Sequence, residues 1–237
     1  MFKTPFIILA AAALVSTAYA ADLSPDSRRV LSLVKGRLDV VGQKAKLMPY
    51  GLYEVTSGNH VFYVDKDVKF FFSGHVFDVA TQKDLTQAKI DEITRIDVKI
   101  LKDALPQALV TKKGNGARTL YLFADPYCHY CKQLEQTLEK VDNVTIYTFV
   151  SPLLDSDEMV EKILSSKNPE KAWRDWMTKG IQPEKASGKK EWVQKNAKLV
   201  EKIGLDGVPV IYFSDGSRSD GAIGLKELNE KLDTLGR

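Results

Sequence analysis

The chain has 237 residues, of which 44% are hydrophobic, and carries 34 lysines and arginines against 31 aspartates and glutamates. The formal net charge of +3 is small and the basic residues are interleaved with acidic ones, so the charge pattern argues against a nucleic-acid or anionic-membrane partner. The length is enough for one large domain or two small ones.

The N-terminal segment has the pattern of a secretory leader. Lys3 gives it a positive start, residues 6–15 are apolar and uncharged, and the Ala-Tyr-Ala run that ends at Ala20 fits the small-x-small cleavage rule. The apolar run is shorter than the roughly 18 residues that a membrane span needs. We therefore predict a signal peptide over residues 1–20, cleaved after about Ala20, and export to a bacterial periplasm. An uncleaved anchor is the alternative.

Residues 21–80 predict a small N-terminal domain built on antiparallel strands. Within residues 25–38, Val30, Leu31 and Val34 have helical spacing. Three strand-like runs separated by turn residues follow, over residues 52–55, 60–64 and 68–72. A domain of fewer than about 60 residues has a marginally stable core unless disulfides, a bound metal or a partner chain stabilise it. We therefore expect this domain to form a homodimer.

Residues 81–113 are predicted to link this domain to the next. Apolar residues recur at helical intervals and indicate one long amphipathic helix over residues 81–105, ending near Pro106: Leu85, Ile93, Ile96, Ile100 and Leu101. A glycine-containing turn then precedes the next strand. An ordinary first helix of the second domain is the alternative interpretation of this stretch.

Residues 114–237 predict a second domain that begins with a βαβ unit. An apolar strand over residues 119–123 precedes the two cysteines, an amphipathic helix follows them, and a second strand covers residues 144–150. Three elements remain: a helical insertion over residues 157–203 with three tryptophans expected in the core, a strand after Pro209 that leads into a hairpin, and a last helix over residues 226–235.

Cys128 and Cys131 are the only cysteines of the chain and form one CxxC motif at the start of the predicted helix. The cysteines of an exported protein normally lie far apart in the sequence and form structural disulfides. A single closely spaced pair therefore indicates a reactive site. Backbone N–H groups and the helix dipole stabilise a thiolate at Cys128, which we predict to be the attacking residue. Cys131 lies one turn further in and is expected to be more buried, to keep its proton and to resolve mixed disulfides.

The neighbours of the cysteines leave several roles open. His129, when protonated, favours the thiolate and makes the pair more oxidising, or it is an exposed histidine of small effect. Tyr130 is expected to pack at the edge of the motif. Asp125 either relays a proton for Cys131 or simply ends a strand before a turn.

Two other interpretations of the cysteines are weaker. A zinc site needs two more ligands, and the histidines are His60, His75 and His129, the first two in the other domain. We therefore predict no metal and no cofactor. A purely structural disulfide across so tight a loop constrains few residues and contributes little stability.

The chain resembles the periplasmic disulfide isomerases of the DsbC and DsbG type. The resemblance rests on residues 123–132 (Phe-Ala-Asp-Pro-Tyr-Cys-His-Tyr-Cys-Lys), on residues 163–169 and on Val208-Pro209 before a strand. It implies a small N-terminal antiparallel-sheet dimerisation domain, a linker helix and a C-terminal thioredoxin-like domain with a helical insertion. It also implies a V-shaped dimer with an apolar cleft, and a cis Pro209 that faces the cysteines while the backbone before it pairs with substrate.

The resemblance further implies a protein disulfide isomerase or reductase that acts on misfolded or misoxidised exported proteins and receives electrons from a membrane reductase of the DsbD type. A net dithiol oxidase and a holdase with secondary redox activity are the alternatives.

Three departures from the family pattern leave the direction of exchange open. The insertion has Ser165 and Ser166 but no second cysteine pair, Val208 stands where these isomerases usually have threonine, and His129 replaces the usual glycine. Together with Tyr130 and Pro209, His129 and Val208 are the residues expected to tune the pair or to bind substrate.

Overall fold

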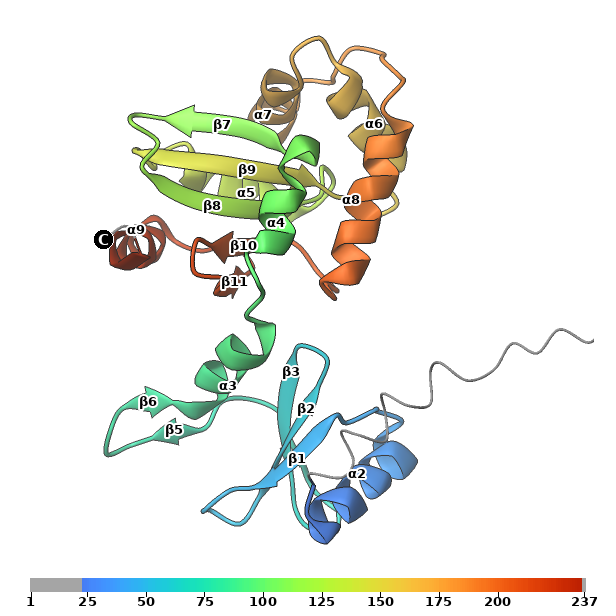
Figure 1. The fold of residues 1–237 in the computed structure, drawn as a ribbon, viewed down its shortest axis with the longest axis vertical. Helices are drawn as coiled ribbons and strands as arrows, with labels where there is room; N and C mark the ends of the chain where they lie inside the picture. Colours follow the sequence, from blue (N-terminus) through green and yellow to red (C-terminus); the bar gives the residue numbers. More distant parts are fainter. Residues whose placement is uncertain (1–22, 236–237) are drawn as a thin grey trace, which may run out of the picture. The chain divides into compact units, whose positions relative to one another are not determined.

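The computed structural model describes residues 23–235, and the predicted signal peptide lies outside them. The chain divides into two compact units, Met1–Ile93 and Thr94–Arg237 (Figure 1). Among the described residues, none of the helices combines the length and the apolar character that crossing a membrane requires.

The first unit begins with helix α2 (Pro25–Leu38), which has the predicted bounds. Ser24 caps it, because the Ser24 side chain accepts a hydrogen bond from the backbone N–H of Ser27 at 3.1 Å. The buried face of the helix, with Val30 and Val34 fully enclosed, packs against a small sheet and forms the core of this unit.

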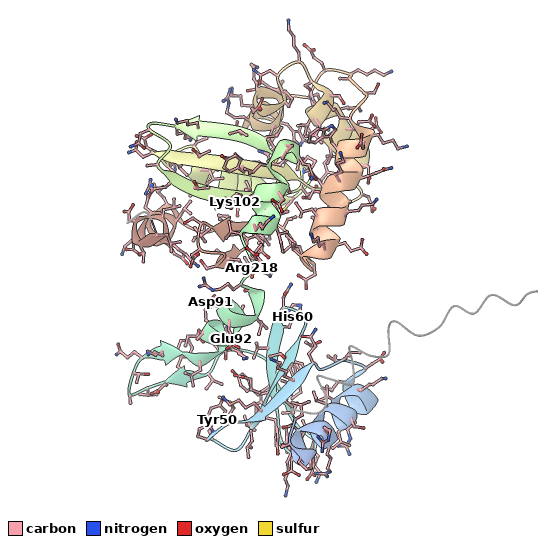
Figure 2. The ribbon with its side chains drawn as sticks, viewed as in Figure 1. Tyr50, His60, Asp91, Glu92, Lys102 and Arg218 are labelled. Carbon is pink, nitrogen blue, oxygen red and sulfur yellow. The ribbon has the colours of Figure 1, made fainter. Side chains whose placement is uncertain are left out.

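That sheet is an antiparallel meander of four strands in the order β1-β2-β3-β4: β1 (Lys44–Leu47), β2 (Tyr53–Ser57), β3 (His60–Val64) and β4 (Phe71–Phe72). Strand β4 is shorter than predicted because the Asp65 carboxylate accepts hydrogen bonds from the N–H groups of Lys69 and Phe70, and because Val68 has a φ of 51°. These contacts keep the chain in a turn until Phe71. Figure 2 labels Tyr50, whose ring meets that of Tyr63 edge-on at 6.2 Å.

The single long helix predicted over residues 81–105 is wrong. The stretch contains a hairpin, two short helices and a 3-10 turn before the next sheet: β5 (Phe77–Asp78), β6 (Lys83–Asp84), α3 (Leu85–Thr94), α4 (Lys99–Asp103) and η1 (Leu105–Gln107). The helix breaks because Arg95 donates to the carbonyl of Asp215 at 2.7 Å and the Ile96 N–H donates to that of Gly216 at 3.1 Å. Tertiary hydrogen bonds thus override the local helical pattern, and the linker over 81–113 is not one helix.

The second unit is built on a mixed five-stranded sheet in the order β11-β10-β8-β9-β7. Its strands are β7 (Leu109–Lys113), β8 (Arg118–Ala124), β9 (Val144–Val150), β10 (Val210–Phe213) and β11 (Arg218–Asp220). Strands β8 and β9 are parallel and are connected by helix α5 (His129–Leu138), which confirms the predicted βαβ unit. The buried Arg218 on β11, labelled in Figure 2, pairs with Asp220.

Helices cover both faces of this sheet: α6 (Asp157–Ser165), α7 (Pro169–Lys179), α8 (Lys190–Lys202) and α9 (Leu225–Leu235) besides α4 and α5 (Figure 1). Alternate residues of β8 belong to two separate apolar clusters, Leu120 and Leu122 to the one that contains both cysteines, and Tyr121 and Phe123 to the other. Helices α6 to α8 form the predicted insertion, so the predicted fold class is confirmed.

Candidate active site

Cys128 lies at the junction between β8 and α5. It is the N-cap residue of α5, and its Sγ accepts a hydrogen bond from the backbone N–H of Cys131 at 3.2 Å. Its own carbonyl accepts the N–H of Lys132, which continues the helix. The sulfur therefore lies at the positive end of the helix dipole, where a negative charge is stabilised.

A tight turn over residues 125–128 delivers Cys128 to this place. The Cys128 N–H donates to the carbonyl of Asp125 at 3.1 Å, and the Tyr127 N–H donates to Oδ1 of Asp125 at 2.7 Å. The fully buried Asp125 also accepts bonds at Oδ2 from the N–H of Leu154 and the hydroxyl of Ser156. Both carboxylate oxygens thus hold the turn against the chain after β9, and a proton-relay role of Asp125 stays a prediction.

Cys131 faces the interior on the next turn of α5. Its side chain is 1% exposed against 6% for Cys128, and both residues are free thiols. Burial, followed by the hydrogen bond with Cys128, raises the pKa of the Cys131 thiol far above its ordinary value. The two sulfurs are therefore unequal: that of Cys128 lies at the start of the helix, and the buried thiol of Cys131 stays protonated at neutral pH.

The loop before β10 lies opposite Cys128. The Val208-Pro209 peptide bond is cis, as the resemblance implies, and the Sγ of Cys128 donates to the Val208 carbonyl at 3.4 Å. The two residues are 80 positions apart, and the pairing of β10 with β8 brings them together. The structure thus gathers Cys128, Cys131, Val208 and Pro209 at one end of the sheet.

His129 and Tyr130 lie on the first turn of α5 and point to solvent. His129 is exposed, and its Nε2 is 3.3 Å from the side-chain amide of Gln133. Tyr130 is 61% exposed and Tyr127, on the other side of Cys128, is 48% exposed. Solvent screens a charge on His129, which favours a small effect on the thiolate, while two aromatic rings flank the cysteine on the surface.

Two further residues near the site were not predicted from the sequence. The Trp176 indole N–H donates to the carbonyl of Pro126 at 2.7 Å, inside the turn before Cys128. The Trp173 indole N–H donates to Glu135 on α5 at 2.7 Å, and burial raises the pKa of Glu135 to about 7. The spacing of the tryptophans places both on the α5-facing side of α7, and that spacing was the available sequence signal.

No group of three or more histidine, cysteine, aspartate or glutamate side chains that can hold a metal occurs within residues 23–235. Of the two histidines of the first unit that were weighed as ligands, His60 and His75, the second pairs with Asp84 at 2.6 Å.

Comparisons with known proteins place the chain in a family. Residues 105–236 match the thioredoxin-like domain family, and residues 35–87 match the disulfide bond isomerase protein N-terminal domain. The crystal structure of a disulfide interchange protein from Neisseria gonorrhoeae is similar, with a TM-score of 0.52 and 30% identity, over 56% of this chain and 98% of that one.

Two curated relatives extend the comparison. A probable thiol:disulfide interchange protein DsbC from Bordetella parapertussis is 37% identical over 191 residues, which are 78% of this chain and 66% of the relative. The thiol:disulfide interchange protein DsbG of Escherichia coli is 28% identical over 131 residues, or 50% of this chain and 53% of that protein. The chain thus spans about two thirds of the first relative's length, and it belongs to the DsbC/DsbG family of thiol:disulfide interchange proteins.

Proposed function

We propose that the protein is a periplasmic thiol–disulfide oxidoreductase whose main activity is to isomerise or reduce wrong disulfides in exported proteins. The observation that carries this proposal is the inequality of the two cysteines. Cys128 lies at the helix start with its sulfur on the N–H of Cys131, while the Cys131 thiol is buried and its pKa is raised. Such a pair has one attacking and one resolving residue.

The reaction begins when the Cys128 thiolate attacks one sulfur of a substrate disulfide. The substrate S–S bond breaks, its other sulfur leaves as a thiolate that takes up a proton, and a mixed disulfide with Cys128 forms. A second substrate thiolate can then attack the substrate sulfur of this bond, which gives a new substrate disulfide and regenerates Cys128. This isomerisation leaves the redox state of the cysteine pair unchanged.

Reduction is the other outcome of the mixed disulfide. Cys131 loses its proton and attacks the Sγ of Cys128, which releases the substrate as a thiol and leaves the two cysteines as a disulfide. Two electrons pass from the pair to the substrate. The pair must then be reduced again, and a membrane reductase of the DsbD type is the proposed donor.

Substrate binding is supported by the surface around Cys128. Tyr127 and Tyr130 expose their rings beside it, and unfolded chains expose apolar side chains that such rings can contact. The backbone at Val208 is the proposed partner of the substrate peptide. Cys128, Cys131, His129, Tyr130, Val208 and Pro209 are therefore the proposed site residues.

A homodimer through the N-terminal domain is part of the proposal. Large apolar side chains are exposed on this unit, namely Leu47, Phe70, Phe71, Phe72, Phe77 and Val79. Such a surface is typical of sites of association or of binding to unfolded chains. It also supports chaperone-like substrate binding, which is the basis of the holdase alternative.

A net oxidase is the second candidate, and Val208 favours it because this valine replaces the threonine that is usual in the isomerases the chain resembles. The redox state of the pair in the cell separates the two. The state of the pair is read by quenching cells with acid and alkylating the free thiols. For an isomerase, Cys128 and Cys131 should be mostly reduced, and a mostly oxidised pair would contradict this function.

The Cys131→Ala variant tests the chemistry. It should accumulate substrates on Cys128 as mixed disulfides that dissolve on reduction, because the resolving thiol is absent. The matched Cys128→Ala variant should trap none. Adducts in both variants, or in neither, would remove Cys128 as the attacking residue.

A further inference from the structure

Trp176 on α7 contacts the segment that carries Cys128 at three points. Its indole N–H donates to the carbonyl of Pro126 at 2.7 Å. Its ring meets the ring of Tyr127 edge-on with 6.4 Å between centroids, and the Nζ of Lys132 lies 4.7 Å from its centroid. A residue of the helical insertion, 50 positions after Pro126, thus touches both sides of the cysteine.

The hydrogen bond to Pro126 acts on the turn that places the sulfur. Inside this turn, hydrogen bonds join Asp125 to Tyr127 and Cys128, and the Asp125 carboxylate also connects the turn to the chain after β9. Trp176 adds a connection from the Pro126 carbonyl to α7. Because Cys128 follows two residues later, a fixed Pro126 carbonyl fixes the sulfur relative to the first N–H groups of α5, whose alignment stabilises the thiolate.

The ring of Trp176 holds the charged end of Lys132 in place. The Lys132 ammonium over an indole face is held by a cation–π contact, and Lys132 is only partly exposed. Lys132 follows Cys128 by four positions, which is the spacing of neighbours on one face of a helix, and a positive charge on that face favours a thiolate. The titratable or charged groups on the segment are Asp125, Tyr127, His129, Cys131 and Lys132. The loop before β10 faces Cys128 with the neutral Val208 carbonyl, which accepts a hydrogen bond from the Cys128 thiol.

We propose that Trp176 is a positioning residue that holds Cys128 in the geometry in which its thiolate is stabilised. The proposal rests on the proposed role of Cys128 as the attacking residue. It assigns to the insertion a part in setting the reactivity of the cysteine, beyond its packing on the sheet.

Two substitutions separate the N–H from the ring. Trp176→Phe keeps a ring and removes the donor, and Trp176→Leu removes both. Trp173→Phe is the matched control, because it removes an indole N–H that also connects α7 to α5, but at Glu135 and away from the turn. The thiolate of Cys128 is titrated by ultraviolet absorbance in the full mature chain, where Cys131 stays protonated.

The midpoint of Cys128 should rise by about half a pH unit in Trp176→Phe and by about one unit in Trp176→Leu, a threefold and a tenfold loss of thiolate well below the midpoint. The equilibrium with glutathione should shift toward the disulfide in the same order, since the reduced form loses stabilisation. Trp173→Phe should titrate like the parent. Folded Trp176 variants with the parent midpoint, or an equal shift in Trp173→Phe, would overturn the proposal.

A double-mutant cycle tests the contact between Lys132 and the ring separately. Lys132→Gln should raise the midpoint of Cys128 in the parent and raise it less in Trp176→Leu, which has no ring to hold the ammonium. Equal effects in both backgrounds would contradict the coupling. The titration needs no substrate, so a failure to rescue scrambled ribonuclease A would remove the proposed function and leave this result standing.

Discussion

The indole N–H of Trp173 and the carboxylate of Glu135 form a 2.7 Å hydrogen bond between the insertion and the helix that carries the cysteines. The carboxylate is held among apolar and charged side chains of α5, α7 and β7, including Lys113, Glu139 and Arg174, and burial is the largest cause of its raised pKa. An acid with a raised pKa in the folded state makes stability depend on pH.

Glu135→Gln tests this dependence. The pKa of Glu135 is about 7 in the folded protein and near its ordinary 4.5 in the unfolded chain. Between these two pH values the folded protein keeps a proton that the unfolded chain loses, so the parent loses stability as pH rises through this window. Glutamine keeps the acceptor for Trp173 and does not titrate. Between pH 4 and pH 8, the free energy of unfolding of the variant should therefore rise relative to that of the parent by on the order of 1–3 kcal/mol, measured by urea unfolding. If the free energies of unfolding of parent and variant change equally with pH, the carboxylate titrates normally.

Asp125→Ala should strongly destabilise the second unit. It removes the acceptor of the buried Ser156 hydroxyl, which costs about 1–3 kcal/mol when left unsatisfied, and also that of the part-buried N–H groups of Tyr127 and Leu154, which cost less because water can reach them. Ser156→Ala removes one of these bonds and should cost only about 1 kcal/mol. Denaturant unfolding of both variants checks the order, and equal losses would contradict it.

The lowered pKa of Asp175 should make stability fall at low pH, opposite to the effect of Glu135. The carboxylate pairs with Lys171 and Lys179 on the same helix, and these hydrogen bonds lower its pKa to about 2. Its contribution is present above its ordinary pKa near 3.8 and is lost as pH falls toward 2. Asp175→Asn should lower the melting temperature at neutral pH, less so at pH 2 and in high salt. A loss independent of pH would assign the effect to packing.

Asn168 caps α7, the helix that carries Trp176. Its side-chain oxygen accepts the N–H of Lys171 at 2.9 Å. Asn168→Ala should cost about 1 kcal/mol of unfolding free energy, whereas Asn168→Asp should retain the cap. Thermal unfolding of the two variants provides the measurement, and a tolerated alanine would mean that packing alone starts the helix.

The elements that the sequence predicted well are those whose signals are local. The helix over Pro25–Leu38 has its serine cap and proline, and the βαβ unit has apolar strands around an amphipathic helix. Strand β1 was missed because Lys44 and Lys46 make an edge strand look like a polar loop. The helix predicted over 81–105 is interrupted because the Arg95 side chain and the Ile96 backbone N–H donate to the carbonyls of Asp215 and Gly216, more than a hundred residues away.

The same division holds for the candidate site. The CxxC spacing and the proline before β10 are local patterns, so Cys128, Cys131 and Pro209 could be named in advance. The contacts of Trp176 with Pro126 and of Trp173 with Glu135 span 50 and 38 positions. The spacing of the two tryptophans indicates that they share one face of α7, but only the fold brings them to Pro126 and Glu135.

The turn before Cys128 is held by residues that emerge later in synthesis. The hydrogen-bond partners of this turn all follow it in the chain. Asp125 bonds to Leu154 and Ser156, the Pro126 carbonyl to Trp176, and the Cys128 sulfur to Val208. A nascent or unfolded chain therefore carries two ordinary thiols. The sulfur reaches its place at the helix start only when the second unit is complete, so the geometry that distinguishes the two cysteines is a product of the folding of the whole unit.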